Sequence, residues 1–119
     1  MTRDTEPFAF KSSNGHDGIC RIERLQLRDG RTLVICHELE ENPGNAVTNV
    51  IEQLIPQVAR KFGLDLRRVV WIEHTEEAEG NAHEWDVVNF KVDRRGSILD
   101  PEWHPMTADD WHELGLEPR

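Results

Sequence analysis

The sequence has no long apolar segment, no tyrosine and only two cysteines. No apolar run approaches the roughly 18–20 residues that a membrane-spanning helix needs, and the polar residues 1–6 do not read as a signal peptide. We therefore expect a cytoplasmic protein. Cys20 and Cys36 are too few to staple a chain of 119 residues, so we expect both to be buried, reduced thiols.

Several motifs that carry chemistry are also missing. Neither Gly-x-Gly-x-x-Gly nor Gly-x-x-x-x-Gly-Lys-Ser/Thr occurs, which removes the commonest phosphate-binding loops. There is no Cys-x-x-Cys and no His-Glu-x-x-His, so no closed metal site is indicated and we expect no cofactor. Cys36 and His37 are neighbours on a predicted strand, so their side chains point to opposite faces and cannot form a nucleophile–base pair.

The charge balance is acidic, with 23 Asp and Glu against 14 Lys and Arg and a formal net charge of −9. Long-range attraction then favours cationic partners, although an acidic surface also simply keeps a small protein soluble. Direct nucleic-acid binding is disfavoured because it usually shows as a basic stripe. Arg24, Arg28 and Arg31 could make a small basic patch near the tip of the first hairpin. We interpret them as a solvated hairpin edge, since no aromatic residues lie between them.

The length predicts one domain. Residues 1–17 include Ser12-Ser13-Asn14-Gly15 and few bulky apolar groups, which predicts a flexible N-terminal arm. Residues 18–119 are predicted to form a single α+β domain.

Two β-rich runs, 19–27 and 32–39, flank the segment Arg28-Asp29-Gly30-Arg31. The Asp-Gly pair is typical of a two-residue type I′ turn, which predicts a hairpin. In that register Cys36 lies opposite Glu23, and the two cysteines point to opposite faces of the sheet.

Apolar residues at three- and four-residue spacing predict a helix from about Ala46 to Phe62. Asn45 suits its N-cap and Gly63 its C-terminal cap. Pro56 interrupts the helix, and we expect a kink there or two abutting helical segments.

Residues 69–74 and 85–92 are predicted to be antiparallel strands joined by an exposed acidic loop. Two prolines in the segment 98–105 predict an irregular tail. Thr107 and Asp110 have the spacing of a capping box, and a short C-terminal helix is expected to follow. The element order β-β-α-β-β-α indicates an α+β fold: an antiparallel sheet of about four strands, covered on one face by the main kinked helix.

The polar residues around the predicted loop suggest a metal site. His74, His83 and Asp86 could converge on zinc, manganese or iron, because imidazole and carboxylate both suit these ions. Their spacing matches no known closed site, and a solvated acidic loop explains the same residues. They stay weak candidates for the centre of a metal-assisted hydrolase.

The four tryptophans suggest a second candidate site. Trp71 and Trp85 lie in predicted strands and are expected in the core. Trp103 and Trp111 flank the proline-containing tail, where they anchor it or face a partner. The acidic residues beside them are Glu102, Asp109 and Asp110. Together these five residues would make an acidic, aromatic surface suited to a basic protein.

The segments Val70–His74, Glu84–Phe90, Pro101–Trp103 and Met106–Trp111 resemble a pattern of small uncharacterised bacterial proteins. The resemblance covers roughly Val69–Leu114. It implies a bacterial origin and supplies no activity, cofactor or catalytic residue.

We favour a small binding or regulatory protein that engages a basic protein partner, because no motif converges on a reaction. One alternative is the metal-assisted hydrolase at the 73–86 hairpin. The other is a structural subunit of a homodimer or larger assembly, which would expose an apolar patch on the sheet.

Overall fold

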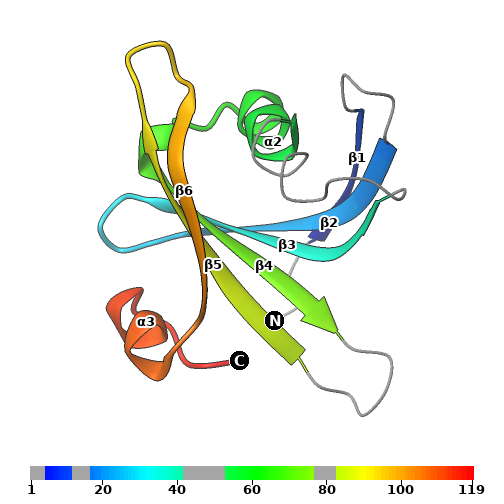
Figure 1. The fold of residues 1–119 in the computed structure, drawn as a ribbon. Coiled ribbons are helices and arrows are strands. Elements are labelled where there is room, and N and C mark those ends of the chain that lie inside the picture. The colour runs from blue at the N-terminus through cyan, green and yellow to red at the C-terminus, as the bar shows by residue number, and fades with distance from the viewer. Residues whose placement is uncertain (1–4, 12–16, 42–52, 77–82) are drawn as a thin grey trace.

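The computed structural model describes residues 5–11, 17–41, 53–76 and 83–119, which form a sheet with a helix on each face (Figure 1). The elements in chain order are β1 (Thr5–Lys11), β2 (Asp17–Gln26), β3 (Thr32–Glu41), α2 (Ile55–Phe62), the 3₁₀ helix η2 (Leu66–Arg68), β4 (Val69–Glu76), β5 (His83–Val92), β6 (Ile98–Pro105) and α3 (Ala108–Glu113).

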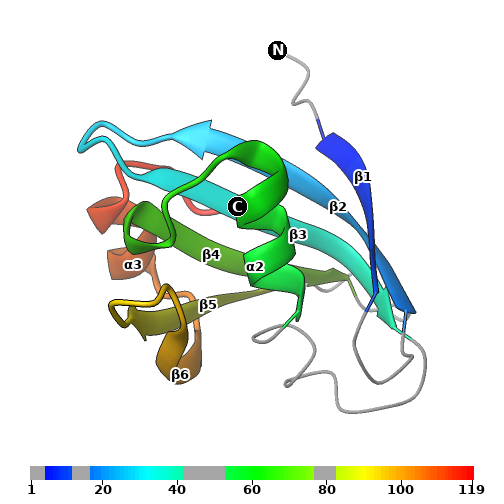
Figure 2. The same ribbon diagram turned by 90° about the horizontal axis from the view of Figure 1, so that it is seen from above.

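The strands lie side by side in chain order, β1-β2-β3-β4-β5-β6. Every neighbouring pair is antiparallel except β3 and β4, which run parallel. A parallel pair needs a crossover connection, and here the crossover includes α2 and η2. Figures 1 and 2 show α2 and α3 on opposite sides of the sheet. We call these sides the α2 face and the α3 face.

The predicted fold class, an antiparallel sheet of about four strands under a main kinked helix, is wrong. The sheet has six strands because two segments predicted to be irregular are extended. It is mixed because β3 and β4 run parallel. Residues 5–11 of the expected arm form the edge strand β1, and residues 98–105 form the other edge strand, β6. Prolines are tolerated in edge strands, where an outward backbone position needs no ladder hydrogen bond.

The β2–β3 hairpin is confirmed, but its turn has three residues rather than two. The N–H of Leu27 donates to the carbonyl of Arg31 at 2.8 Å. Gly30 has a φ of 91°, typical of a turn that ends in a left-handed glycine. The longer turn moves the register by one residue, so that Cys36 lies opposite Ile22. Both cysteines are therefore buried on the α2 face as thiols that form no disulfide, and their predicted placement on opposite faces is wrong.

The sheet carries a separate apolar layer on each face. The core of the α2 face combines strand residues with one side of α2, and its buried members are Phe8, Phe10, Cys20, Ile22, Val34, Cys36, Leu54, Ile55, Val58, Trp71 and Val88. The core of the α3 face is smaller, and its buried members are Leu27, Leu33, Ile35, Ile72, Val87 and Trp111. In the described part of the chain, no helix has the length and apolarity to span a membrane.

The helix α2 is the described part of the predicted helix and begins at Ile55. Residues 45–52, which include the predicted N-cap Asn45, lie outside the described residues. Pro56 occupies the first turn, where its missing N–H would have no partner within the helix. Residues 53–54 are π-helical and lead directly into α2, so the helical conformation changes just before Pro56. Gly63 ends the helix with a φ of 64°, as its predicted capping role requires.

The short C-terminal helix α3 and its capping box are confirmed. The Thr107 hydroxyl accepts from the N–H of Asp110 at 3.2 Å, and the Asp110 carboxylate accepts from the N–H of Thr107 at 2.8 Å. At the other end, the N–H of Leu116 donates to the carbonyl of Trp111 at 3.0 Å, next to Gly115 with a φ of 75°. This reversal sends the following segment back across the α3 face and brings Arg119 to the sheet.

Candidate functional site

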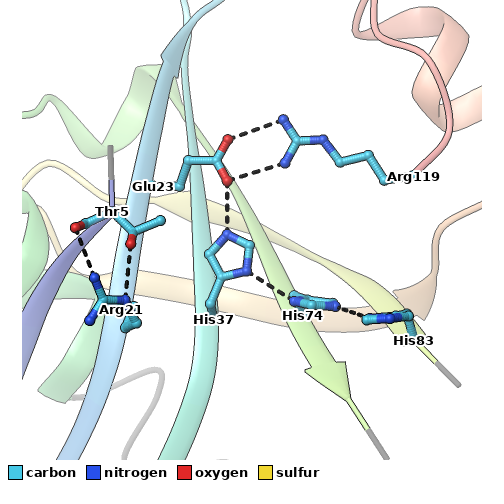
Figure 3. A network of polar contacts seen from close by, with 7 residues as sticks. All are labelled: Thr5, Arg21, Glu23, His37, His74, His83 and Arg119. Carbon is cyan, nitrogen blue, oxygen red and sulfur yellow. Dashed lines mark hydrogen bonds and ion pairs between the residues drawn. The ribbon is translucent and has the colours of Figure 1, made fainter. Parts of the chain in front are cut away.

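A line of titratable side chains crosses the α3 face (Figure 3). Glu23, His37, His74 and His83 come from β2, β3, β4 and β5, which are neighbouring strands. The parallel register sets His37 directly beside His74, and His83 lies opposite Glu76, two residues further along β4. Alternation of side chains then places all four on one face. We call Glu23, His37, His74 and His83 the histidine line.

Glu23 anchors the inner end of the line. Its residue is only 3% exposed. The Arg119 guanidinium forks onto both carboxylate oxygens at 3.2 and 3.1 Å, and His37 Nε2 lies 2.8 Å from one of them. Burial raises the pKa of Glu23, but the hydrogen bonds from Arg119 and His37 outweigh burial and hold the pKa below its usual value. Glu23 is therefore ionised at neutral pH.

The hydrogen bonds assign one tautomer to each neutral imidazole. An ionised carboxylate only accepts, so His37 donates from Nε2 and accepts at Nδ1. This Nδ1 lies 2.9 Å from Nδ1 of His74, which must then donate. His74 Nε2 accepts in turn from Nδ1 of His83 at 2.8 Å. Nε2 of His83 is left as the one ring nitrogen whose lone pair is not used within the line.

Aromatic contacts hold the middle of the line in place. The His74 ring stacks on Trp85 with ring centroids 4.0 Å apart and planes 16° apart. Trp85 meets the edge of Trp111 at 5.5 Å, and the Arg119 guanidinium lies 5.9 Å from the Trp85 ring. The residues that orient the imidazole are thus the same ones that attach α3 and the following segment to the sheet.

The surroundings of His74 favour its neutral form. Burial lowers the pKa of His74, and the neighbouring His37 and His83 lower it further. The carboxylates of Glu76 and Glu38 act in the opposite direction but do not compensate. Glu38 follows His37 in a β-bulge and has a φ of 54°, a backbone conformation that is uncommon outside glycine.

The outer end of the line reaches a part of the α3 face that no described residue covers. Trp111 and the residues around it lie over the other part, above Ile72 and Val87. The exposed residues of the uncovered part are Pro7, Ala9, Ile19, Arg21, Glu76 and His83. We call this surface the open half-face. Ile19 is 50% exposed, and the Arg21 guanidinium is bound to the hydroxyl and carbonyl of Thr5.

The structure brings together two of the three residues considered as metal ligands. His74 and His83 are hydrogen-bonded neighbours, whereas Asp86 lies opposite Glu73 and alternates with Val87, which places it on the α2 face. The two nitrogens of His74 face different partners, so the line does not converge on one point. Within residues 5–11, 17–41, 53–76 and 83–119, no group of three His, Cys, Asp or Glu side chains is arranged to hold a metal ion.

The five residues considered for partner binding do not form one surface. Trp103 is half-buried in the α2-face core, where its indole N–H donates to Glu73 at 3.4 Å. Trp111 is buried on the α3 face, with 3% exposed. The acidic members lie around α3: Glu102 and Asp109 are exposed, and Asp110 is engaged in the capping box. Their role in binding a partner stays a prediction.

Sequence reasoning missed Glu23, His37 and Arg119. The predicted two-residue turn put Glu23 opposite Cys36, which hid its contact with His37. One signal was available in the sequence. On each of the two strands a polar residue occupies a position where the alternation predicts a buried apolar one: Glu23 precedes Leu25 by two residues, and His37 follows Ile35 by two. No local signal exists for Arg119, because its position depends on the reversal at Gly115.

Comparison of the chain with protein-family models, with curated proteins and with solved structures found no significant match.

Proposed function

We propose that this chain is a small binding protein that engages a basic protein partner through the open half-face. The observation that carries the proposal is the histidine line, which runs from a buried, ionised Glu23 to an exposed imidazole at His83. The lone pair on Nε2 of His83, which no described residue uses, is a hydrogen-bond acceptor. The contacts within the line fix the direction in which it points.

The chemistry around His83 suits a cationic donor. Glu76 lies opposite His83 in the register, and Glu38 follows His37 on the neighbouring strand. A lysine or arginine side chain of a partner can donate to an imidazole lone pair and to a carboxylate at the same time. The formal net charge of −9 attracts such a partner over a longer range.

The contacts that fix the histidine line favour a role in binding a partner over a purely solvated polar surface. Each imidazole is fixed by a partner on both sides or by stacking, so little rotamer entropy remains to be lost when a ligand binds. Exposed apolar residues beside the line, Pro7, Ala9 and Ile19, supply surface that a partner can cover.

The test is capture of partners on immobilised protein, with three variants as matched baits. H83A/E76Q removes the proposed acceptor and carboxylate; E84Q makes the same charge change on the opposite face of β5. E102Q/D109N instead removes the acidic residues near α3. The proposal expects basic proteins that wild type, E84Q and E102Q/D109N retain equally and that H83A/E76Q does not retain.

Two results would contradict this function. Retention by H83A/E76Q equal to wild type would show that the open half-face is not used. Loss confined to E102Q/D109N would move the binding surface to the acidic residues around α3.

A further inference from the structure

Six arginines meet at the end of the molecule where β4 begins. They come from three separate segments: the β2–β3 turn, η2 and the β5–β6 turn. Figures 1 and 2 both show these segments at the left side of the molecule, in cyan, green and yellow. The six residues are Arg28, Arg31, Arg67, Arg68, Arg94 and Arg95. We call this surface the arginine end.

The same short turn occurs in each of the three segments. The sequences are Asp29-Gly30-Arg31, Asp65-Leu66-Arg67 and Asp93-Arg94-Arg95. In each, the aspartate carboxylate accepts the backbone N–H of the arginine two residues later, at 2.9, 3.0 and 2.8 Å. Side-chain hydrogen bonds of this kind hold the backbone of a turn in one conformation. The carboxylates are thus engaged within their own turns.

The 3₁₀ helix η2 ties the three turns into one surface. The Arg67 guanidinium donates to the carbonyl of Asp93 at 2.7 Å, and that of Arg68 to the carbonyl of Asp29 at 3.4 Å. The Arg68 guanidinium lies close over the hairpin turn: a Cβ on Gly30 would be 2.6 Å from Arg68 Nη2 and would displace the end of this side chain. The arginines are therefore carried on a backbone that is cross-linked by hydrogen bonds.

The local charge of this end is opposite in sign to that of the whole chain. Residues 28–31, 65–68 and 93–97 hold six arginines and three aspartates, a formal net charge of +3, which leaves −12 for the rest of the chain. Charges further apart than about 8–10 Å are largely screened at physiological ionic strength. A ligand at this end therefore meets a local excess of positive charge. Five of the arginines are exposed, while Arg31 and Arg67 pair with Asp29 and Asp65 at 2.7 and 3.8 Å.

A hollow of about 580 Å³ adjoins the arginine end. Its wall carries the cations Arg31, Arg67 and Lys91 and the carboxylates Asp110 and Glu113. It lies away from the histidine line, since none of the four line residues contributes to its wall. The cations of the hollow are thus partly balanced by carboxylates, and the outer side of the arginine end is the side considered below.

We infer that the arginine end binds the phosphate backbone of double-stranded nucleic acid. The guanidinium group is a planar fork that matches two phosphate oxygens, and all six cations of the three turns are arginine rather than lysine. The turns contain no aromatic residue on which an unpaired base could stack. Contacts to phosphates alone position a protein on a duplex without reading its sequence.

This surface was not visible in the linear sequence. The overall acidity argued against nucleic acid, and the six arginines are spread between positions 28 and 95. Only the fold brings them together. The inference does not depend on the proposed function, because the open half-face lies near the other end of β4.

The test is binding of a short fluorescent DNA duplex of mixed sequence, followed by anisotropy at about 50 and about 200 mM salt. With about four phosphates contacted, we expect the affinity to fall about a hundredfold between these salt concentrations. R94A/R95A should lower the slope of log affinity against log salt concentration by about two. The matched control R60A/K61A removes the same charge from α2 and should leave the slope unchanged.

Each other outcome overturns the inference. Absence of duplex binding at low salt would overturn the inference. If R60A/K61A lowered the salt slope as much as R94A/R95A, the binding would be non-specific attraction to any cation of the protein. Arginine-dependent binding of polyglutamate in place of the duplex would assign the surface to an acidic protein. Arginine-dependent binding to vesicles that contain phosphatidylserine, without duplex binding, would assign it to a membrane surface. H83A/E76Q should bind the duplex like wild type, so failure here is distinct from failure of the proposed function.

Discussion

Glu23 shows how a single charged residue can organise one face of this sheet. A buried charge that loses its partner destabilises a protein by about 3–5 kcal/mol, so the carboxylate depends on Arg119 and His37. In return it fixes which nitrogen of His37 carries a proton, and through His37 the orientation of His74 and His83. The state of the exposed imidazole is thus set by a residue three strands away.

The lowered pKa values predict two stages of stability loss as the pH falls. The ordinary pKa of histidine is 6.5, and folded His74 lies below it. Below that pH the unfolded chain therefore binds more protons, and the free energy of unfolding decreases. Glu23 causes the second stage, at lower pH. Its contribution to the free energy of unfolding is complete above its ordinary pKa of 4.5 and is lost as the pH falls through its lower folded pKa. Urea unfolding at a series of pH values measures both stages.

The variant His74→Gln identifies the first stage. It keeps a polar side chain beside His37 and Trp85 but cannot titrate, so the upper stage should shrink while the lower one remains. An upper stage of unchanged size in H74Q would show that His74 does not cause it.

The sequence singled out His74 and His83 but not what they do together. His74 was predicted at the end of a strand and His83 in the loop before the next strand, both as possible metal ligands. The structure has both on strands, next to each other in a hydrogen-bonded line. Side-chain type and approximate position are local information. The partner of each residue depends on strand register, and one extra residue in the β2–β3 turn was enough to hide the contact between Glu23 and His37.

Among the elements, the helix α3 is specified by residues that lie close to it in the sequence. Thr107→Ala removes the side-chain acceptor of the capping box and should lower the free energy of unfolding by about 1 kcal/mol. Thr107→Ser keeps the hydroxyl and is expected to lose much less. Chemical denaturation of the two variants beside wild type measures the difference. Equal stability of T107A and T107S would mean that the cap does not stabilise α3.

The elements that sequence reasoning could not predict are those defined by distant neighbours. The capping box and Gly115 lie within a few residues of α3, so this helix was predicted. The parallel pairing of β3 with β4 joins residues 32–37 to residues 69–74 across a crossover, and no local pattern distinguishes it from an antiparallel pair. The segment of β6 was predicted to be irregular because of its two prolines, which an unpaired outer edge tolerates. The segment of β1 was predicted to be part of an arm because it has few bulky apolar groups and precedes Ser12-Ser13-Asn14-Gly15.

At the scale of the whole molecule, the parallel pair lies at the centre of the sheet. Leu33, Ile35 and Ile72 are fully buried there, while β1 and β6 form the edges. Local opening requires least energy where few buried contacts are lost. We expect the slowest amide hydrogen exchange in β3 and β4 and the fastest among the strands in β1 and β6. Exchange in β1 as slow as in β3 would contradict this order.

The four tryptophans are divided between the two faces, which gives the molecule a built-in optical reporter. Trp71 and Trp103 belong to the α2 face, and Trp85 and Trp111 to the α3 face. With no tyrosine in the chain, ultraviolet emission comes from indole alone. A protonated imidazole quenches the emission of an indole against which it stacks. The intensity from Trp85 therefore follows the charge on His74, and the protonation state of this face can be read without a label.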